Sequence, residues 1–473
     1  MEDQRPFPIS QRSAEELLGD ALPQEACRLI EMLEGGGYES WVVGGFVRDV
    51  LLGREGHDVD VATAAPWQEV RRIAEGAGLR VHETGVRFGG VTVSFPEDWE
   101  GRGTGEAGVA AIEVTTFRTD GPSADGRHPD RIDQAASIEE DLARRDFTMN
   151  ALAFHPGRGL IDPYGGLEAL AAEAIKAVGD PRVRFKEDAL RILRACRFAS
   201  QLGFRLAPAT YESMVQGKGG LAGMSTERIS HELDRLVLGE HIHDALMGTV
   251  DGLAFVLPEL VVMKGCPQRT PYHIYDVLEH TAFAMERMPP TRLGRWAALF
   301  HDMGKPAAAF IGPDGREHFY AHAQVSMALA RGVMGRMQMS QGFQKKVLAL
   351  VEHHDDAMEP TARSVKRMLA RLGGDAELLR TLCHLKRADA LAQAPFCAER
   401  AVLAEELEAI LDDILAEGAA FSIRDLAISG RDLIGCGVPK GPRVGALLEE
   451  ALEAVVDERV PNEREALIEL LGL

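Results

Sequence analysis

Two acidic residues lie two positions apart in the segment Asp58-Val59-Asp60. The β-branched pattern of Val59 to Ala62 predicts a strand, and residues two apart on a strand point to the same face. Carboxylates held side by side repel each other unless a cation binds between them, and Mg²⁺ prefers carboxylate oxygens. Glu113, in a later predicted strand, is a candidate third acid. The pattern predicts a catalytic site that holds two Mg²⁺ ions, which would activate a hydroxyl and neutralise a leaving pyrophosphate.

A glycine pair precedes these acids in the segment Gly44-Gly45-Phe46-Val47-Arg48-Asp49. A short strand at residues 41–43 is predicted to enter the glycine turn, and a helix is predicted to follow it. Backbone N–H groups and the positive end of the helix would then point at one place, which suits a polyphosphate. Arg48 lies one turn into that helix and would add a positive charge to the same place.

A basic segment stands out in an acidic chain of 473 residues with a net charge of −21. Residues 182–205 contain seven Lys or Arg side chains and only two acidic ones, Glu187 and Asp188. A protein binds the phosphates of a nucleic acid through Lys and Arg side chains. For such binding, the local positive charge matters more than the net charge of the chain. Arg191, Arg194 and Arg197 follow Asp188 at intervals of three, which predicts one side of a helix.

One carboxylate and one guanidinium together can distinguish nucleobases. Cytosine and adenine both present an amino donor beside a ring-nitrogen acceptor, which match an Asp acceptor and an Arg donor. Uracil and guanine present a carbonyl and an N–H at these positions, so both contacts are lost. Sites built on paired polar contacts reject such analogues by orders of magnitude. An Asp–Arg pair would therefore select C and A without a nucleic-acid template.

Four segments resemble, in order and spacing, the class II tRNA nucleotidyltransferase and bacterial poly(A) polymerase family. They are GGFVRDVLLG…DVD, RRDFTMNALAF at 144–154, DPYGGLEAL at 162–170 and EDALRILRACRFASQLGF at 187–204. The resemblance spans residues 40–240 and implies an α+β fold, with a polymerase-β-type head followed by an all-α neck, body and tail. It implies that Asp188 and Arg191 contact the base. The nucleotide-binding set that we expect is Gly44, Gly45, Arg48, Asp49, Arg145, Asn150, Asp188, Arg191, Arg194 and Arg197.

A second set of candidate ligands is rich in histidine. His280, the pair His301-Asp302 and Asp389 follow the order His…His-Asp…Asp, which resembles the HD phosphohydrolase superfamily. Imidazoles and carboxylates on neighbouring helices suit a divalent transition metal, whose bound water becomes a nucleophile. Three more histidines would extend the set to two metals: His322, His353 and His354.

The order of predicted elements divides the chain. The first 155 residues mix strands and helices, and the chain is almost wholly helical from residue 169 onward. Residues 120–133 are rich in Gly, Pro and Asp and predict a mobile loop, which resembles the flexible loop of the family. Breaks at 264–271 and 393–395 indicate further junctions. We therefore expect a head (1–158), a neck (159–265), an HD domain (266–395) and a helical tail that contacts tRNA (396–473).

Composition excludes several classes of protein. The apolar stretches are short and broken by charges, so no membrane span is expected. The six cysteines form no CxxC pair, and the first residues lack the pattern of a secretory signal. These features predict a cytoplasmic enzyme without a disulfide framework. No obligate protein partner is indicated.

The predicted reaction is attack of a tRNA 3′-hydroxyl on the α-phosphate of CTP or ATP, with release of pyrophosphate. Several alternatives remain open on the sequence: addition of the full CCA end, of CC alone or of A alone, and synthesis of poly(A). A further alternative is a phosphohydrolase in which the HD region carries the activity and the head is regulatory.

Overall fold

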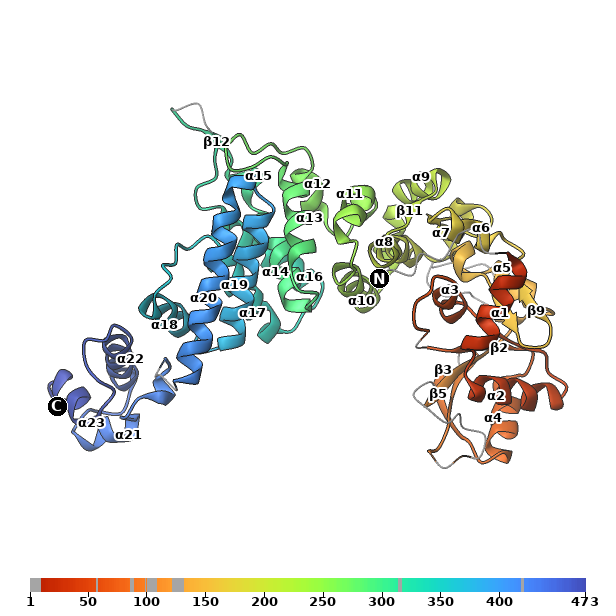
Figure 1. Ribbon diagram of the computed structural model, residues 1–473, viewed down its shortest axis with the longest axis horizontal. Helices are drawn as coiled ribbons and strands as arrows, with labels where there is room; N and C mark the ends of the chain where they lie inside the picture. The colour runs from red at the N-terminus through yellow and green to blue at the C-terminus, as the bar shows by residue number, and fades with distance from the viewer. Residues whose placement is uncertain are drawn as a thin grey trace. The chain divides into compact units, whose positions relative to one another are not determined.

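A computed structural model describes residues 10–56, 58–85, 89–97, 99, 109–120, 132–313, 317–417 and 421–473 (Figure 1). The chain forms two compact units. One comprises Met1–Ile229 with Asp251–Val256, and the other comprises Ser230–Val250 with Leu257–Leu473. The head and most of the predicted neck thus belong to one unit, while the predicted HD domain and tail belong to the other.

The first unit contains a seven-stranded mixed sheet with the strand order β3-β4-β5-β2-β1-β8-β9. Neighbouring strands are antiparallel, except that β2 and β5 are parallel. The sheet strands are β1 (Ser40–Val43), β2 (Asp60–Thr63), β3 (Arg80–Gly85), β4 (Gly90–Ser94), β5 (Ala111–Thr116), β8 (Ala153–His155) and β9 (Gly159–Ile161). Two-stranded pairs are formed by β6 (Arg118–Asp120) with β7 (Ile132–Gln134) and by β10 (Ala174–Ile175) with β11 (Arg205–Leu206). This sheet confirms the predicted α+β class.

Alternation along the central strands gives the sheet two buried faces. Trp41 and Val43 of β1 pack into a cluster with Phe117 and Leu142, while Val42 lies on the opposite face and is fully buried. The helices of this unit are α1 (Gln11–Ala21), α2 (Gln24–Gly35), α3 (Gly45–Leu51), α4 (Trp67–Gly76), α5 (Ile138–Ala143), α6 (Gly166–Ala171), α7 (Pro181–Glu187), α8 (Leu190–Leu202) and α9 (Pro208–Gly217). Two further helices, α10 (Thr226–Val237) and α11 (Ile242–Leu253), each have a few residues in this unit and the rest in the second unit. Short 3-10 helices are η2 (Thr148–Asn150) and η3 (Lys218–Gly223).

The second unit is a helical bundle with one small hairpin, β12 (Phe310–Ile311) and β13 (Glu317–His318). Helices α13, α14, α17 and α19 pack against one another around a core that includes Trp296 and Phe300, and α16 packs on α14 and α17. Its helices are α12 (Pro258–Met263), α13 (Val277–Arg287), α14 (Arg292–Phe300), α15 (Lys305–Ala308), α16 (His322–Arg336), α17 (Gln341–His353), α18 (Ala362–Arg371), α19 (Ala376–Leu391), η4 (Pro395–Cys397) and α20 (Ala398–Ala416).

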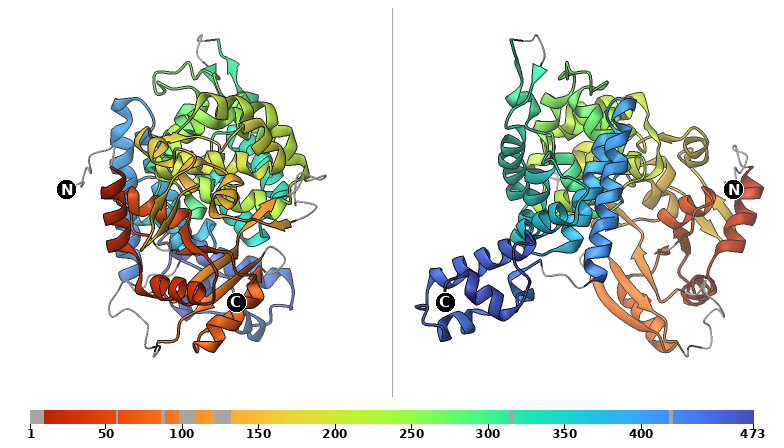
Figure 2. Two further views of the ribbon diagram at one scale, coloured as in Figure 1. Left: turned by 90° about the vertical axis from the view of Figure 1, so that its right-hand side faces the viewer. Right: turned by 60° about the vertical axis from the view of Figure 1, so that its left-hand side comes forward.

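The last helices form a small cluster beyond the end of α20, drawn in dark blue in Figures 1 and 2. They are η5 (Ile423–Asp425), α21 (Gly430–Gly435), α22 (Pro442–Val456) and α23 (Arg464–Leu470). Leu433, Ala451 and Leu467 form their own hydrophobic core, against which Ala370 of α18 packs. The predicted junction at 393–395 falls between α19 and α20, which lie along each other, so α20 continues the bundle.

Two sequence expectations differ from the structure or fall outside it. The predicted mobile loop lies mostly at residues 121–131, which are outside the described residues. Asp188 is not on a helix: α7 ends at Glu187, and α8 begins at Leu190. Among the helices that the structure describes, none combines the length and apolar character needed to cross a membrane.

Candidate active site and metal centre

The acidic residues predicted to bind Mg²⁺ gather at one end of strands β2 and β5. Asp60 is the first residue of β2, and it is the register partner of Glu113 in the parallel strand β5. Burial raises the pKa of Asp60 to about 6, and the nearby charges of Glu113 and Asp58 add to this effect, while Arg145 opposes it. A carboxyl group whose ionisation is disfavoured by two neighbouring acids is a group that a bound cation would stabilise.

The three acids do not form a closed set of ligands. In the described chain, the groups of three or more ligand atoms that lie within 4.8 Å of one another are both in the second unit. Asp58 is exposed and precedes β2, whereas Asp60 is partly buried. The donor set, carboxylate oxygens on two central strands and just ahead of β2, suits Mg²⁺, which keeps several waters and shares its ligands with substrate phosphates.

Gly44 brings the glycine turn against Arg145. Its φ of 73° lies in the left-handed region, which favours glycine. A Cβ at this position would lie 2.8 Å from Nη1 of Arg145 and 4.0 Å from Oδ2 of Asp60. The Gly44 turn therefore lies close to both the Arg145 guanidinium and the Asp60 carboxylate. Any side chain at residue 44 would displace the arginine that lies nearest to the acidic residues.

A chain of charged groups connects α3 to α8. The Arg48 guanidinium donates to both oxygens of Asp49 at 2.8 and 2.9 Å and to Asn150 Oδ1 at 2.7 Å. Asn150 in turn donates to Asp146 Oδ1, and Arg194 donates to Asp146 Oδ2 at 2.7 Å. Burial acts to raise the pKa of Asp146, but Arg194 and the hydrogen bonds outweigh it and hold this pKa below its ordinary value.

Three predicted nucleotide-binding arginines surround the ring of Phe198. The guanidinium carbons of Arg197, Arg48 and Arg194 lie 4.4, 5.1 and 5.5 Å from the ring centroid. Phe147 contacts the same ring edge-on at 5.8 Å between centroids. Arg197 is only 3% exposed. An aromatic ring attracts cations and holds these side chains together, which gives a preformed cationic cluster suited to phosphate.

The two predicted base contacts lie three residues apart in sequence but hold different partners. Asp188 Oδ1 accepts from the Leu190 N–H, and its Oδ2 pairs with Arg228 at 2.9 Å. Arg191 donates to Glu187 at 2.9 Å and to the Arg144 carbonyl at 2.7 Å. Both side chains are therefore fixed before any base binds. Fixed donors and acceptors distinguish bases better than mobile ones, because no ordering is needed on binding.

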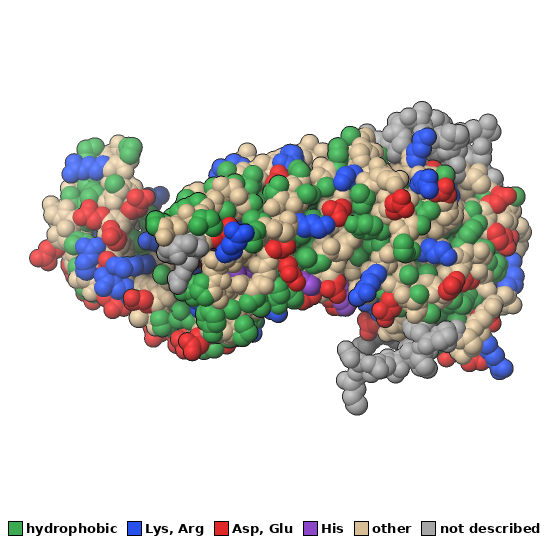
Figure 3. Space-filling view, turned by 90° about the horizontal axis from the view of Figure 1, so that it is seen from above, with side chains coloured by type: hydrophobic (Ala, Val, Ile, Leu, Met, Phe, Trp, Pro, Cys, Tyr) green, Lys and Arg blue, Asp and Glu red, His purple; other side chains and the backbone are tan. Residues whose placement is uncertain are grey.

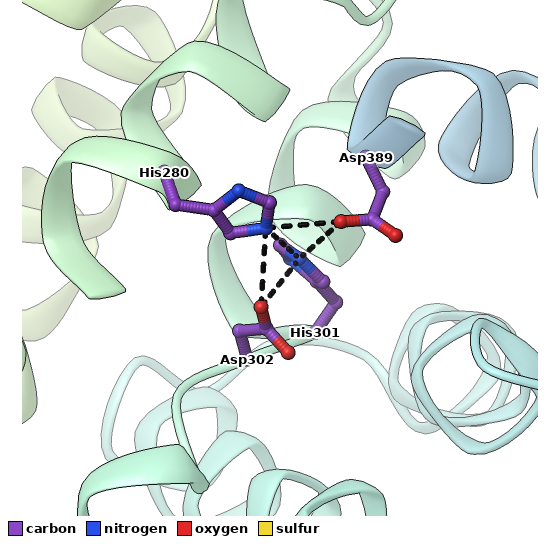
Figure 4. Close-up of side chains that lie close together, drawn as sticks. All are labelled: His280, His301, Asp302 and Asp389. Carbon is purple, nitrogen blue, oxygen red and sulfur yellow. Dashed lines mark hydrogen bonds and ion pairs between the residues drawn. The ribbon is translucent and has the colours of Figure 1, made fainter. Parts of the chain in front are cut away.

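The second unit brings four predicted metal ligands into direct contact: His280, His301, Asp302 and Asp389 (Figure 4). His280 Nε2 lies 2.9 Å from Asp389 Oδ1 and 3.2 Å from Asp302 Oδ2. His301 Nε2 lies 3.2 Å from the same Asp302 oxygen and 3.3 Å from His280 Nε2. Both histidines are fully buried.

Backbone carbonyls fix the orientation of these imidazoles. His280 Nδ1 donates to the Ala392 carbonyl at 3.1 Å, and His301 Nδ1 donates to the Ala298 carbonyl at 2.7 Å. A neutral imidazole with its proton on Nδ1 directs the Nε2 lone pair at the centre of the group. Histidines that bind metals in proteins are commonly oriented in this way. Burial opposes the charge of His301, but Asp302 and Asp389 outweigh burial and raise its pKa to about 10. The group therefore favours a positive charge at Nε2, from a proton or a metal.

A second group shares Asp302: its other oxygen, Oδ1, lies 3.3 Å from His322 Nε2 and 3.7 Å from His354 Nε2. The Nδ1 atoms of these histidines also donate to backbone carbonyls, at Phe319 and Val351. His353 is outside both groups, because its Nδ1 pairs with Asp356 at 2.8 Å. The candidate ligand in the pair His353–His354 is therefore His354, which corrects the expectation for His353.

Sequence reasoning missed three residues that position the predicted site. Asp146 belongs to the segment RRDFTMN and accepts hydrogen bonds from both Asn150 and Arg194. Its position in that motif could have indicated a role in the site. Arg228 pairs with Asp188 from 40 residues away, and no local pattern indicates this contact. Lys305 lies 2.6 Å from Asp302 Oδ2 and is buried. It follows His301-Asp302 by one helical turn, where a partner for the acid was predictable.

The head and the last third of the chain match two family models. Residues 40–176 match the poly(A) polymerase head domain. Residues 318–471 match a putative tRNA nucleotidyltransferase domain 2. These segments contain the acidic residues of β2 and β5 and three of the histidine-group ligands, His322, His354 and Asp389.

Relatives extend over nearly the whole chain. A CCA-adding enzyme of Geobacillus thermodenitrificans is 33% identical over 450 residues, which cover 94% of this chain and 95% of the relative. A CCA-adding enzyme of Levilactobacillus brevis is 31% identical and covers 94% and 98%. The crystal structure of the Bacillus stearothermophilus CCA-adding enzyme in complex with CTP is 30% identical, with a TM-score of 0.70, and covers 95% and 96%. The chain therefore belongs to the family of CCA-adding enzymes.

Proposed function

We propose that this chain adds C and A residues to the 3′ end of tRNA from CTP and ATP, without a nucleic-acid template. The observation that carries the proposal is the position of Asp60 beside Glu113 and Arg145, next to the glycine turn at Gly44. Relatives of this length and identity are named CCA-adding enzymes, and one binds CTP. The same relatives favour tRNA repair over poly(A) synthesis.

In the proposed reaction, the tRNA 3′-hydroxyl attacks the α-phosphate of the nucleotide, and pyrophosphate leaves. Asp58 and Asp60 would hold two Mg²⁺ ions, with Glu113 as a third acid; when bound, they activate the hydroxyl and neutralise the leaving group. Arg145 and the arginines around Phe198 would bind the triphosphate, because guanidinium groups match phosphate oxygens in pairs. The N–H groups that follow Gly44 would add further donors at the start of α3.

Base selection in this proposal depends on Asp188 and Arg191. The carboxylate accepts from the amino group of C or A, and the guanidinium donates to the ring nitrogen. Arg228 and Glu187 hold the two side chains in place. On the face of the molecule shown in Figure 3, basic and acidic side chains are interspersed. Binding of tRNA would thus depend on shape and on local basic clusters, as structured RNA usually requires.

Three tRNA substrates test the proposal directly: transcripts that end before CCA, after the first C and after CC. Each is incubated with one labelled nucleotide at a time, and products are resolved on a sequencing gel. We expect C on the first two transcripts, a single A on the third and no extension with UTP or GTP. Long A tracts on unrelated RNA would instead support a poly(A) polymerase. A pattern with only C or only A would identify a partial enzyme.

The histidine groups support a second candidate activity, hydrolysis of a phosphoester. Asp302 is shared by two groups, which together would hold two divalent transition metals and supply a metal-bound water as nucleophile. A cavity of about 390 Å³ adjoins them, lined by ligands His354 and Asp389 and by Lys386 and Arg400. Gln393 donates to both oxygens of Asp389 and accepts from Arg400, so hydrogen bonds connect an arginine of the cavity wall to a metal ligand.

Metal content should separate His353, the last residue of α17, from His354, which follows it. We expect His301→Ala and His354→Ala each to lower the transition metal bound per chain, because each removes an imidazole aimed at Asp302. His353→Ala is the matched control and should keep the wild-type content, since its side chain pairs with Asp356. The measurement is elemental analysis after purification and dialysis against a defined metal. Equal content in all four proteins would contradict the ligand assignment.

A further inference from the structure

Three aromatic rings, which we call the ring stack, contact one another at the β12–β13 hairpin. Figure 1 labels strand β12 of this hairpin. Phe310 and His318 are cross-strand partners, with ring centroids 5.5 Å apart and planes inclined by 30°. His318 and Tyr320 lie 5.2 Å apart at 24°. Tyr320 is 71% exposed and Phe310 is 44% exposed. Phe310 and Tyr320 also contact each other, with centroids 5.4 Å apart and planes inclined by 50°. The ring stack is therefore a compact group of three mutually contacting rings, in which Tyr320 and Phe310 face solvent.

The same segment carries a candidate metal ligand. His322 follows Tyr320 by two residues, so their Cα atoms are at most about 7 Å apart. The carbonyl of Phe319, between them, accepts from His322 Nδ1 at 2.9 Å. The Phe319 ring lies 5.6 Å from Nζ of Lys305, which itself pairs with Asp302. His318 and Tyr320 thus form the outer stack, while the residue between them faces the metal-binding groups.

A hydrogen bond fixes the base of the hairpin to an earlier segment of the same chain. The Glu317 carboxylate is buried and accepts from the Arg269 N–H at 2.9 Å. This contact fixes the strand that carries His318, so the ring stack is held in register with His322. Rings with a fixed spacing and an open outer face are the arrangement on which unpaired nucleobases stack.

We propose that this ring stack, Phe310, His318 and Tyr320, binds an unpaired base of an RNA strand and directs a phosphate of that strand to the metal-binding histidine groups. The inference rests on the second candidate activity, because the phosphate would be the group hydrolysed there. RNA is favoured over a protein partner because planar rings stack on planar bases, and because the adjacent groups suit phosphate chemistry.

Photocrosslinking of the full-length protein tests this surface. The probe is a single-stranded hexaribonucleotide with one 4-thiouridine, irradiated without added metal so that binding is measured apart from hydrolysis. Trypsin releases residues 317–331 as one peptide, which contains His318 and Tyr320. We expect a crosslink to that peptide in the wild type. Tyr320→Ala should weaken it about tenfold, since each stacked base contributes roughly that factor or more, and Tyr320→Phe should retain it.

Phe255→Ala is the matched control, because this ring is 44% exposed but belongs to the other unit. It should leave the crosslink to residues 317–331 unchanged. All three variants should incorporate C and A into tRNA at the wild-type rate, since none alters the nucleotide site of the head. No crosslink in residues 317–331, an equal crosslink in Tyr320→Ala, or retention of a protein but not of RNA by this surface would each overturn the inference. Loss of C and A incorporation in the wild type would count against the proposed function instead.

Discussion

Asp60→Asn should abolish nucleotide incorporation, with a loss of at least about a thousandfold, while the head stays folded. The amide keeps the size of the side chain but removes the charge that would hold Mg²⁺. Asp58 and Glu113 remain and do not replace it, because Asp58 is exposed ahead of β2 and Glu113 lies on the neighbouring strand. Single-turnover assays with tRNA and CTP measure the effect. Incorporation within tenfold of the wild type would contradict the assignment.

The same substitution should stabilise the protein in the absence of metal. A pKa of about 6 for Asp60, against an ordinary value of 3.8, means that folding disfavours the charged carboxylate. The penalty is absent below about pH 4, grows as the pH rises and is complete above about pH 6, where it amounts to roughly 1–3 kcal/mol. Thermal unfolding at pH 7.5 should therefore show a higher midpoint for Asp60→Asn. Adding Mg²⁺ should raise the midpoint of the wild type and leave that of the variant unchanged.

The sequence indicates Asp60 as part of an acidic site because a strand and its parallel neighbour are local features, and the Mg²⁺ assignment stays a prediction. The parallel strand β5 is in register with β2 and places Glu113 beside Asp60, whereas Asp58 precedes β2 and is not placed by strand alternation. The predicted turn at Gly44 and Gly45 is also local, since only the backbone conformation and the following helix are needed. The resemblance of ordered motifs predicts the α+β head and the helical remainder, which the sheet and bundle confirm.

The partners of these residues were not predictable from spacing. The interval of three predicts Asp188 on the helix of the arginines, but Asp188 lies between α7 and α8, and its side chain accepts from the Leu190 N–H at the start of α8. Arg228 reaches Asp188 across 40 residues of sequence. Among adjacent histidines, His354 and not His353 faces Asp302, because neighbours on a helix point in directions about a quarter-turn apart. That choice depends on the packing of α17 against α14 and α19, which no local pattern contains.

Asp188→Ala should relax base selection more than it lowers turnover. The variant still binds the triphosphate through the arginines near Phe198, because these contacts are independent of the base. It loses the carboxylate that accepts from the amino group of C and A. The carbonyl that UTP and GTP present at the same position is then no longer repelled by a carboxylate. We expect discrimination against UTP to fall by at least about a hundredfold, since polar base contacts of this kind account for factors of that size or larger.

Competition assays with CTP and UTP on tRNA that ends before CCA measure this ratio, and Asp180→Ala is the matched control. Asp180 is an exposed acid that caps α7 and accepts from the Arg182 N–H, so its loss affects the helix end without touching the base. Arg228→Ala should lie between the two, because Asp188 keeps its charge and its contact with Leu190 but loses the guanidinium that fixes its second oxygen. If Asp188→Ala kept wild-type selectivity, the carboxylate would have no part in choosing the base. Selection would then have to come from the shape of the site around Arg191, whose contacts with Glu187 and the Arg144 carbonyl remain in that variant.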